Sequence, residues 1–331
     1  MKRILAGLFA AAALAWPALA QQVPEPVQPP PHLSPWPDLG TGFNEPQKQA
    51  SLISGPEMHR GETARAMLAE RRKLDAALEA LQPQRRGTID AYVVAVALDS
   101  DPVFSREARE AGKVLARRYG AEGRTVTLAG PDGRSAGLPK GSITALTVTL
   151  ARVAELMDPA EDVLVLYSTS HGAQVGLAYH DGDNGFGILS PSRLGLLLGE
   201  LGIQRRVVVL SACYAGVFVP LLASRDTAIV TAASADRTSF GCQADNDWTF
   251  FGDALVNNAL RKPLPLVDAA AEARQSIAQW EASSGLTPSQ PQVVIGDLAA
   301  GWLATLEARI PRTATAPVGA PAVNSLQVAG R

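Results

Sequence analysis

The sequence predicts an α/β protein in which a mostly parallel central sheet is covered by helices on both faces. Apolar runs rich in Val and Leu recur along the chain, among them residues 162–168, 206–210 and 227–231. Strands with apolar residues at successive positions are buried on both faces, as in a parallel sheet. Helix-length segments separate these runs, and this alternation of strands and helices is typical of α/β folds.

The predicted elements follow one another from residue 88 to about 305. Strands are expected at 89–98, 124–128, 162–168, 206–210, 227–231 and 292–295. Helices are expected at 105–119, 142–157, 190–201, about 248–260 and 265–282. A turn at 131–133, with the sequence Pro-Asp-Gly, follows the second strand. The chain contains no internal repeat.

The composition indicates a globular protein with a substantial core. Of its 331 residues, 47% are hydrophobic and 19% are charged, which argues against a mainly disordered chain. The formal net charge is −2, and there is no basic stripe to neutralise phosphates, so nucleic acid is not expected as a partner. The sequence does not indicate the oligomeric state.

Residues 1–20 have the pattern of a signal peptide. Lys2 and Arg3 precede an apolar stretch, and Ala18-Leu19-Ala20 forms a small-x-small cleavage signal before Gln21. A membrane anchor is the alternative, but the stretch is short and ends at Pro17. Later apolar runs fall well below the ~20 residues that span a bilayer. We therefore expect an exported protein, periplasmic or secreted, without stable membrane insertion after cleavage.

The remaining chain divides by composition. A Pro-rich linker is expected at 21–45, a helical segment at 46–85, the main domain at 86–305 and a disordered tail at 306–331. In the helical segment, Met67, Leu74, Leu78 and Leu81 form one apolar stripe. This segment is expected to be a docked brace, with a pro-region and a partner-binding helix as alternatives.

Two polar motifs directly follow buried strands. Residues 167–172 read YSTSHG after the strand at 162–168, and residues 210–216 read LSACYAG after the strand at 206–210. Because one crossover connects the two strands, they are expected to be close neighbours in the sheet. Ligands of open parallel sheets bind beyond the carboxyl ends of the strands. His171 and Cys213 are therefore expected at the same edge.

These residues match the needs of a cysteine nucleophile. Exposure of Cys213 beside a helix N-terminus would favour its thiolate form, and His171 would protonate a leaving amine. Gly172 has no Cβ to obstruct its backbone, so its N–H and that of Cys213 are candidate oxyanion donors. A lone His or Cys is more often structural, and only the combination at two adjacent strand ends is specific.

The motifs resemble those of the legumain-like cysteine peptidases, a family that shares its fold with the caspases and includes the catalytic subunit of the glycosylphosphatidylinositol transamidase. SHG and SACYAG resemble the family's His-Gly and Ala-Cys motifs. The likeness continues through 231–240 and 248–253 and covers roughly 88–296. It is greatest to the exported bacterial branch. The resemblance implies a caspase-like three-layer sandwich and a cysteine-type endopeptidase.

The resemblance also implies roles for individual residues. His171 and Cys213 match the catalytic dyad, and Gly172 with Cys213 matches the oxyanion donors. Arg106 matches a basic residue of the primary specificity pocket, with pairing to Glu110 as the alternative. Ser239 matches a residue of the pocket wall.

One position departs from the family pattern. Ser211 stands where animal and plant legumains have an acidic residue, two positions before the nucleophile. Loss of this acceptor tilts the expected preference from Asn towards Asp. The acceptor would be restored if the pocket loop folds inward and brings in one of three carboxylates, Asp236, Asp245 or Asp247.

The same motifs are compatible with functions other than hydrolysis. The same acyl-enzyme would serve a transpeptidase or transamidase, and a non-catalytic caspase-like binding module is a further alternative. A nucleotide-binding domain is disfavoured because no phosphate-binding glycine motif follows the first strand. No cofactor or metal is expected: residues 180–185, HDGDNG, lack the later acidic ligands of a calcium loop and favour a hairpin turn. Cys242 is expected to be free or buried, since bridging it to Cys213 would abolish the nucleophile.

Overall fold

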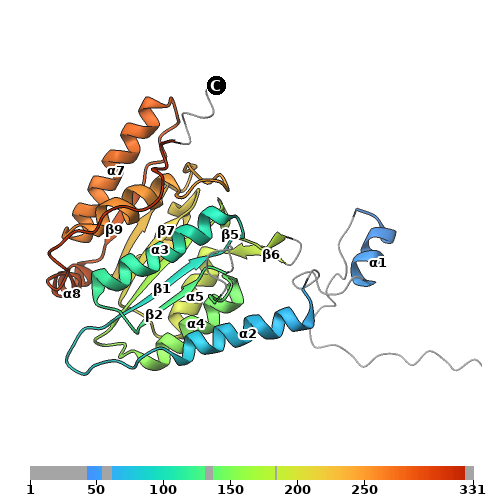
Figure 1. Cartoon of the computed structure of the whole chain (residues 1–331), viewed down its shortest axis with the longest axis horizontal. Helices are drawn as coiled ribbons and strands as arrows, with labels where there is room; N and C mark the ends of the chain where they lie inside the picture. The colour runs from blue at the N-terminus through green and yellow to red at the C-terminus, as the bar shows by residue number, and fades with distance from the viewer. Residues whose placement is uncertain (1–42, 54–61, 131–136, 183–184, 325–331) are drawn as a thin grey trace, which may run out of the picture. The chain divides into compact units, whose positions relative to one another are not determined.

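The computed structural model describes residues 43–53, 62–130, 137–182 and 185–324 (Figure 1). The predicted signal peptide, and the linker up to residue 42, lie outside the described residues. The chain divides into two units, residues 1–52 and 53–331. Helix α1 (Glu45–Ile53) begins in the first unit, where the Asn44 side chain accepts a hydrogen bond from the Gln47 N–H at 3.0 Å. The second unit contains the sheet and every candidate site residue.

A six-stranded sheet forms the centre of the second unit, in the order β2-β1-β3-β7-β8-β9. The first five of these strands in that order are parallel, and only β9 is antiparallel to its neighbour β8. The mostly parallel sheet predicted from the sequence is therefore confirmed. Its strands are β1 (Ala91–Ala97), β2 (Thr125–Leu128), β3 (Val163–Thr169), β7 (Arg206–Ser211), β8 (Thr227–Thr231) and β9 (Gln292–Ile295).

Alternate side chains of each strand enter two cores on opposite faces of the sheet. Val93 and Ala95 of β1 face one core, whereas Tyr92 and Val94 face the other. The first core is closed by α3 (Pro102–Tyr119), η4 (Gly252–Asn258), η5 (Ala259–Arg261), α7 (Leu266–Ser283) and α8 (Asp297–Glu307). The second is closed by α4 (Ile143–Leu156), α5 (Pro191–Glu200), η3 (Ala215–Phe218) and α6 (Val219–Leu222). The result is the three-layer sandwich (Figure 1).

A second, three-stranded antiparallel sheet follows β3 directly and was not predicted. It consists of β4 (Gly172–Ala173), β5 (Gly176–His180) and β6 (Phe186–Leu189). The Asp181 N–H donates to the Gly185 carbonyl at 2.8 Å at the base of the β5–β6 connection. The hairpin expected at 180–185 is thus present. These strands are too short and too rich in Gly and Ala to give an alternating pattern in the sequence.

Three helical elements differ from the expectation. α3 begins at Pro102 instead of residue 105, because Pro is favoured in the first turn of a helix. The helix expected at about 248–260 is a π-helical segment followed by a 3-10 turn. α8 has no counterpart in the predicted elements.

Helix α2 (Ala64–Glu79) carries the predicted apolar stripe and contacts α4. Leu78 and Leu81 are buried in the second core, whereas Met67 at the start of the stripe is 40% exposed. At the N-terminal end, the Lys140 ammonium pairs with Glu62 at 2.9 Å and with Asp181 at 3.0 Å. The C-terminal half of α2 is therefore part of the packed domain.

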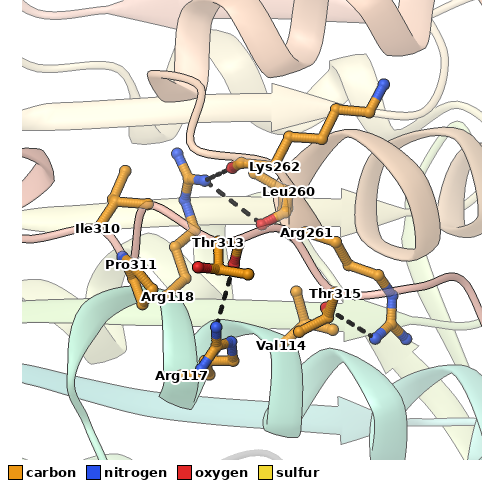
Figure 2. Close-up of a pocket in the computed structure, with 10 residues that line it drawn as sticks. All are labelled: Val114, Arg117, Arg118, Leu260, Arg261, Lys262, Ile310, Pro311, Thr313 and Thr315. Carbon is orange, nitrogen blue, oxygen red and sulfur yellow. Dashed lines mark hydrogen bonds between the residues drawn. The ribbon is translucent and has the colours of Figure 1, made fainter.

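The segment after α8 is held on the domain as far as residue 324, whereas the sequence predicts disorder from residue 306. The Trp248 indole N–H donates to the Val318 carbonyl at 2.8 Å, and the Ala322 N–H donates to Asp253 at 2.8 Å. Figure 2 shows the same segment passing α3, where the Arg117 guanidinium donates to the Thr313 carbonyl. The cavity drawn there measures about 20 Å³, roughly the space of one water. Composition alone does not reveal this docking, because the bonds use backbone groups.

Among the described residues, no helix combines the length and the apolar character needed to cross a membrane.

Candidate active site

The sheet brings His171 and Cys213 to one edge. Thr169 at the end of β3 is paired with Ser211 at the end of β7, and each candidate residue lies two positions further on. The Ser170 N–H donates to the Ser211 carbonyl at 3.2 Å, so the ladder continues past the strand ends. The juxtaposition predicted from the two motifs is therefore present in the structure.

Gly172 makes this close approach possible. A Cβ at position 172 would lie 2.0 Å from the carbonyl oxygen of Cys213, which real Cβ atoms do not approach. The backbone of the His171 loop thus lies directly against the backbone of the Cys213 loop. Any other residue at 172 would separate the two loops.

Cys213 lies in a turn that directs its sulfur towards the loop after β8. The Ser239 N–H donates to the Cys213 Sγ at 3.3 Å, and the Ser239 carbonyl lies 3.5 Å from the same sulfur. The following residue, Tyr214, has a φ of 57°, which is uncommon for a residue other than glycine. Its N–H donates to the Arg237 carbonyl at 2.8 Å, and this bond holds the turn in place. Cys213 is partly exposed and free of any disulfide.

His171 is positioned by Phe104 of α3 and by Asp101, the residue that precedes this helix. Its ring makes an edge-on contact with Phe104, with centroids 5.0 Å apart. Its Nε2 lies 3.4 Å from the Asp101 carboxylate, and its side chain is 42% exposed. Sequence reasoning missed Asp101, although its place after β1, at the edge where β3 and β7 also end, is a usable signal.

Cys242 is the second free cysteine and packs beside Phe104. Burial raises the pKa of the Cys242 thiol above its ordinary value, and electrostatic interaction with nearby Cys213 adds to the rise. A neutral, partly buried thiol is a poor nucleophile. This agrees with the expectation of a free or buried thiol at this position.

Arg106 lies at the first turn of α3, but its guanidinium contacts the loop after Gly241. Its Nε donates to the Asn246 carbonyl at 3.1 Å, and its Nη2 donates to the Ala244 carbonyl at 2.6 Å. Asp247 completes the set at 3.5 Å. Pairing with Glu110, the alternative drawn from the sequence, is not among these contacts. Arg106 therefore ties α3 to the loop that also carries Cys242.

The other predicted pocket residues lie in different surroundings. Ser239 contacts Cys213 as described above, whereas the hydroxyl of Ser211 is buried and bonded to Thr249 at 3.1 Å. Asp236 is exposed and accepts a bond from the Ser234 hydroxyl at 2.6 Å. This bond lowers the pKa of Asp236. The structure brings Ser239 to the sulfur of Cys213 but shows no contact of Asp236 with it.

Glu107 is a buried carboxylate that sequence reasoning missed. It accepts hydrogen bonds from the Tyr167 hydroxyl at 2.6 Å and from the Thr249 hydroxyl and N–H at 2.7 and 2.9 Å. Burial, reinforced by the Glu107 charge, raises the pKa of Tyr167 well above its ordinary value, so the phenol remains a donor. This network lies beneath Ser211 and fixes α3 and η4 on the sheet.

One group of possible metal ligands occurs among the described residues. Ligand atoms of Asp99, Asp101 and His171 all lie within 4.8 Å of one another. Two of the three are partly exposed, and hard cations usually need six or more oxygen ligands. The group therefore falls short of a built metal centre, and its His171–Asp101 contact serves to orient the imidazole.

The fold and the site define a class of protein, a caspase-like α/β sandwich with a cysteine and a histidine at adjacent strand ends. Residues 141–301 match the model of the peptidase C13 family, the legumain family. These residues are thus legumain-like, as the motifs predict, and the match supports a cysteine peptidase. Such a peptidase acts on protein or peptide substrates. The matched region contains His171, Gly172, Cys213 and Ser239 but begins after Arg106.

The fold also has similarity to a solved structure, the crystal structure of caspase-1 from Spodoptera frugiperda. The sequences are 12% identical, the TM-score is 0.42, and the match covers 65% of this chain and 92% of that chain. At this TM-score the similarity is no evidence for the fold, which is assigned from the order and direction of the strands. No curated protein matches the chain.

Proposed function

We propose that this protein is an endopeptidase in which Cys213 attacks the scissile carbonyl and His171 manages the protons. The observation that supports it is the contact between the His171 and Cys213 loops, which only glycine at 172 permits. This contact supports a site in which Cys213 is the nucleophile, His171 is the proton donor and the N–H groups of Gly172 and Cys213 bind the oxyanion, as acyl transfer requires.

The chemistry proceeds in two steps. The thiolate of Cys213 adds to the carbonyl carbon, and the oxyanion so formed is stabilised by the N–H groups of Gly172 and Cys213. His171 gives its proton to the leaving nitrogen as the C–N bond breaks, which leaves a thioester. A water then loses a proton to His171 and attacks the thioester, and the C–S bond breaks to release the acid and regenerate the thiolate beside the protonated His171. Asp101 holds the imidazole in place.

We further propose a preference for Asn or Asp before the cleaved bond, drawn from the family resemblance. The contacts of Arg106 indicate how it would act: it shapes the loop at 241–248 and offers its remaining donors from that position. Ser239 would line the same pocket beside Cys213.

We also propose that the protein is exported. The mature protein should begin at Gln21 when its N-terminus is sequenced after expression with the intact signal peptide.

The decisive experiment compares the hydrolysis of a peptide library by the wild type and three variants. Cys213→Ala should abolish turnover, and His171→Ala should lower kcat by about 10²–10⁴-fold. Cys242→Ser is the matched control and should retain activity, because its thiol serves packing. An acyl-reactive peptide probe should label Cys213 alone. Turnover of Cys213→Ala near the wild-type rate would contradict the role of Cys213 as nucleophile. A preference for Lys or Arg over Asn and Asp would contradict the proposed specificity.

A further inference from the structure

The sheet that follows His171 has an unusual outer face. In β5 and β6, Leu177 and Leu189 point into the second core, and Tyr179 is buried on the same face of the sheet. The opposite face of an antiparallel sheet is commonly polar, yet here it carries Phe186 and Ile188, which are 61% and 43% exposed. Val175, in the turn between β4 and β5, is 62% exposed. We call Val175, Phe186 and Ile188 the apolar row.

The apolar row lies on the side of the sheet where the catalytic histidine lies. His180 shares the outer face with Phe186, to which it is paired across the strands. The His180 imidazole lies 3.8 Å from the Asp99 carboxylate, and Asp99 in turn lies within 4.8 Å of the His171 ring nitrogen. The outer face therefore borders the candidate site.

The distance from His171 to this row can be followed along the hydrogen bonds. The Ala178 N–H donates to the His171 carbonyl at 3.0 Å, and Ala178 is paired with Ile188 on the next strand. Two strand spacings of about 4.8 Å place Ile188 about 10 Å from the His171 backbone. An extended peptide advances about 3.3 Å per residue, so this distance corresponds to about three residues.

The proposed chemistry decides which part of a substrate passes over this row. The histidine must protonate the leaving nitrogen, so the residues after the cleaved bond leave on the histidine side. The carbonyl side of the substrate lies at Cys213 and Ser239 instead. The β4–β6 sheet extends away from His171, and residues 172–179 and 185–190 contain no Asp, Glu, Lys or Arg. The surface therefore suits apolar side chains.

We propose that the apolar row binds apolar side chains of the substrate two to four residues after the cleaved bond. This inference rests on the proposed function and adds to it a selectivity on the leaving-group side. Apolar side chains docking on Phe186 and Ile188 would bury surface that is otherwise in contact with water. Partial burial of a large apolar side chain should favour such substrates about tenfold in kcat/KM.

The test uses three substrates with the same residues up to and including Asn or Asp before the cleaved bond. The first releases a small fluorogenic amine and has no residues after the bond. The second is an internally quenched peptide with Leu or Phe at the second to fourth positions after the bond, and the third has Ser at these positions. The wild type should prefer the second over the third about tenfold. The double variant Phe186→Ser, Ile188→Ser should reduce this ratio to about one and leave hydrolysis of the fluorogenic amide unchanged.

Controls separate this inference from the proposed function. Leu196→Ser, at a 70% exposed site on α5, should leave the preference intact. Binding of the two quenched peptides to Cys213→Ala, measured by fluorescence anisotropy, should show the same preference without turnover. A wild-type ratio of one, or a ratio unchanged in the double variant, would overturn the inference while hydrolysis of the fluorogenic amide still supports the proposed function. Sedimentation showing that the double variant breaks a dimer, with the ratio unchanged, would assign the row to self-association instead.

Discussion

At the scale of single residues, the site depends on backbone contact as much as on side-chain chemistry. Gly172 lies against the carbonyl of Cys213, and the Ser239 N–H points at the sulfur of Cys213. An N–H that faces sulfur interacts more strongly with a thiolate than with a thiol. Asp101 adds a side-chain contact on the other partner. Cys213 and His171 are thus both positioned by residues outside their own loops.

Replacement of Gly172 by Ala should lower activity by at least about 100-fold, the loss typical of removing one oxyanion donor. The new Cβ meets a backbone oxygen at 2.0 Å, and no rotamer change relieves such a contact. The measurement is kcat/KM on the fluorogenic substrate. Gly199→Ala is the matched control, because a Cβ there meets nothing within 4 Å. Equal activity of the two variants would show that the loops move apart without cost.

At the scale of elements, α2 behaves as part of the domain. Its C-terminal half contributes Leu78 to the second core, and its other end is tied to the domain through Lys140, whose pKa is raised by hydrogen bonds to Glu62 and Asp181 despite its partial burial. A pro-region that is released on activation would not be expected to supply core residues. The structure therefore favours the brace over the pro-region.

Leu78→Ala should lower the free energy of unfolding by about 2–4 kcal/mol, because it leaves a cavity in a packed core. Leu68→Ala on the same helix is the control, since Leu68 is 50% exposed and its truncation should change stability by about 0.5 kcal/mol or less. Urea denaturation of both variants measures the difference.

If α2 is a brace, a chain that begins near Gly87 should aggregate. If that shortened chain were soluble and more active, the pro-region would be supported instead.

At the scale of the whole molecule, the C-terminal segment binds elements that are distant from it in sequence. The carboxylate of Asp253, a buried residue of η4, accepts hydrogen bonds from Asn257 and from the backbone of Ala322. Val318 accepts bonds from the Trp248 indole and the Asn257 amide at 2.8 and 3.0 Å. Loss of these partners would leave polar groups buried and unpaired.

A chain that ends at Pro311 should therefore unfold at a lower urea concentration than the full chain, with a loss of at least about 2 kcal/mol, since each unpaired buried group costs about 1–3 kcal/mol. A chain that ends at Asn324 retains all of these bonds and is the control. Both are measured by urea denaturation followed by tryptophan fluorescence, because Trp248 reports on the segment directly. Identical midpoints for the two shortened chains would show that the segment does not stabilise the domain.

The sequence by itself determined the mostly parallel sheet and the proximity of the His171 and Cys213 loops. Buried parallel strands carry continuous Val and Leu runs, and such runs are visible without any tertiary information. The adjacency of β3 and β7 also follows, because a single crossover joins them. His171 and Cys213 could be placed together for this reason, and Gly172 beside them.

Only the tertiary structure decided the contacts that involve backbone groups and distant segments. Arg106 binds the carbonyls of a loop about 140 residues away, and Asp101 reaches His171 across 70 residues. The sheet at β4–β6 likewise depends on pairing between backbone N–H and C=O groups, which every residue type possesses. Residues 308–324 dock through their own backbone groups, whose partners include the side chains of Trp248 and Asp253. Periodicity reveals which side chains are buried, whereas the partners of backbone groups are fixed only when the chain has folded.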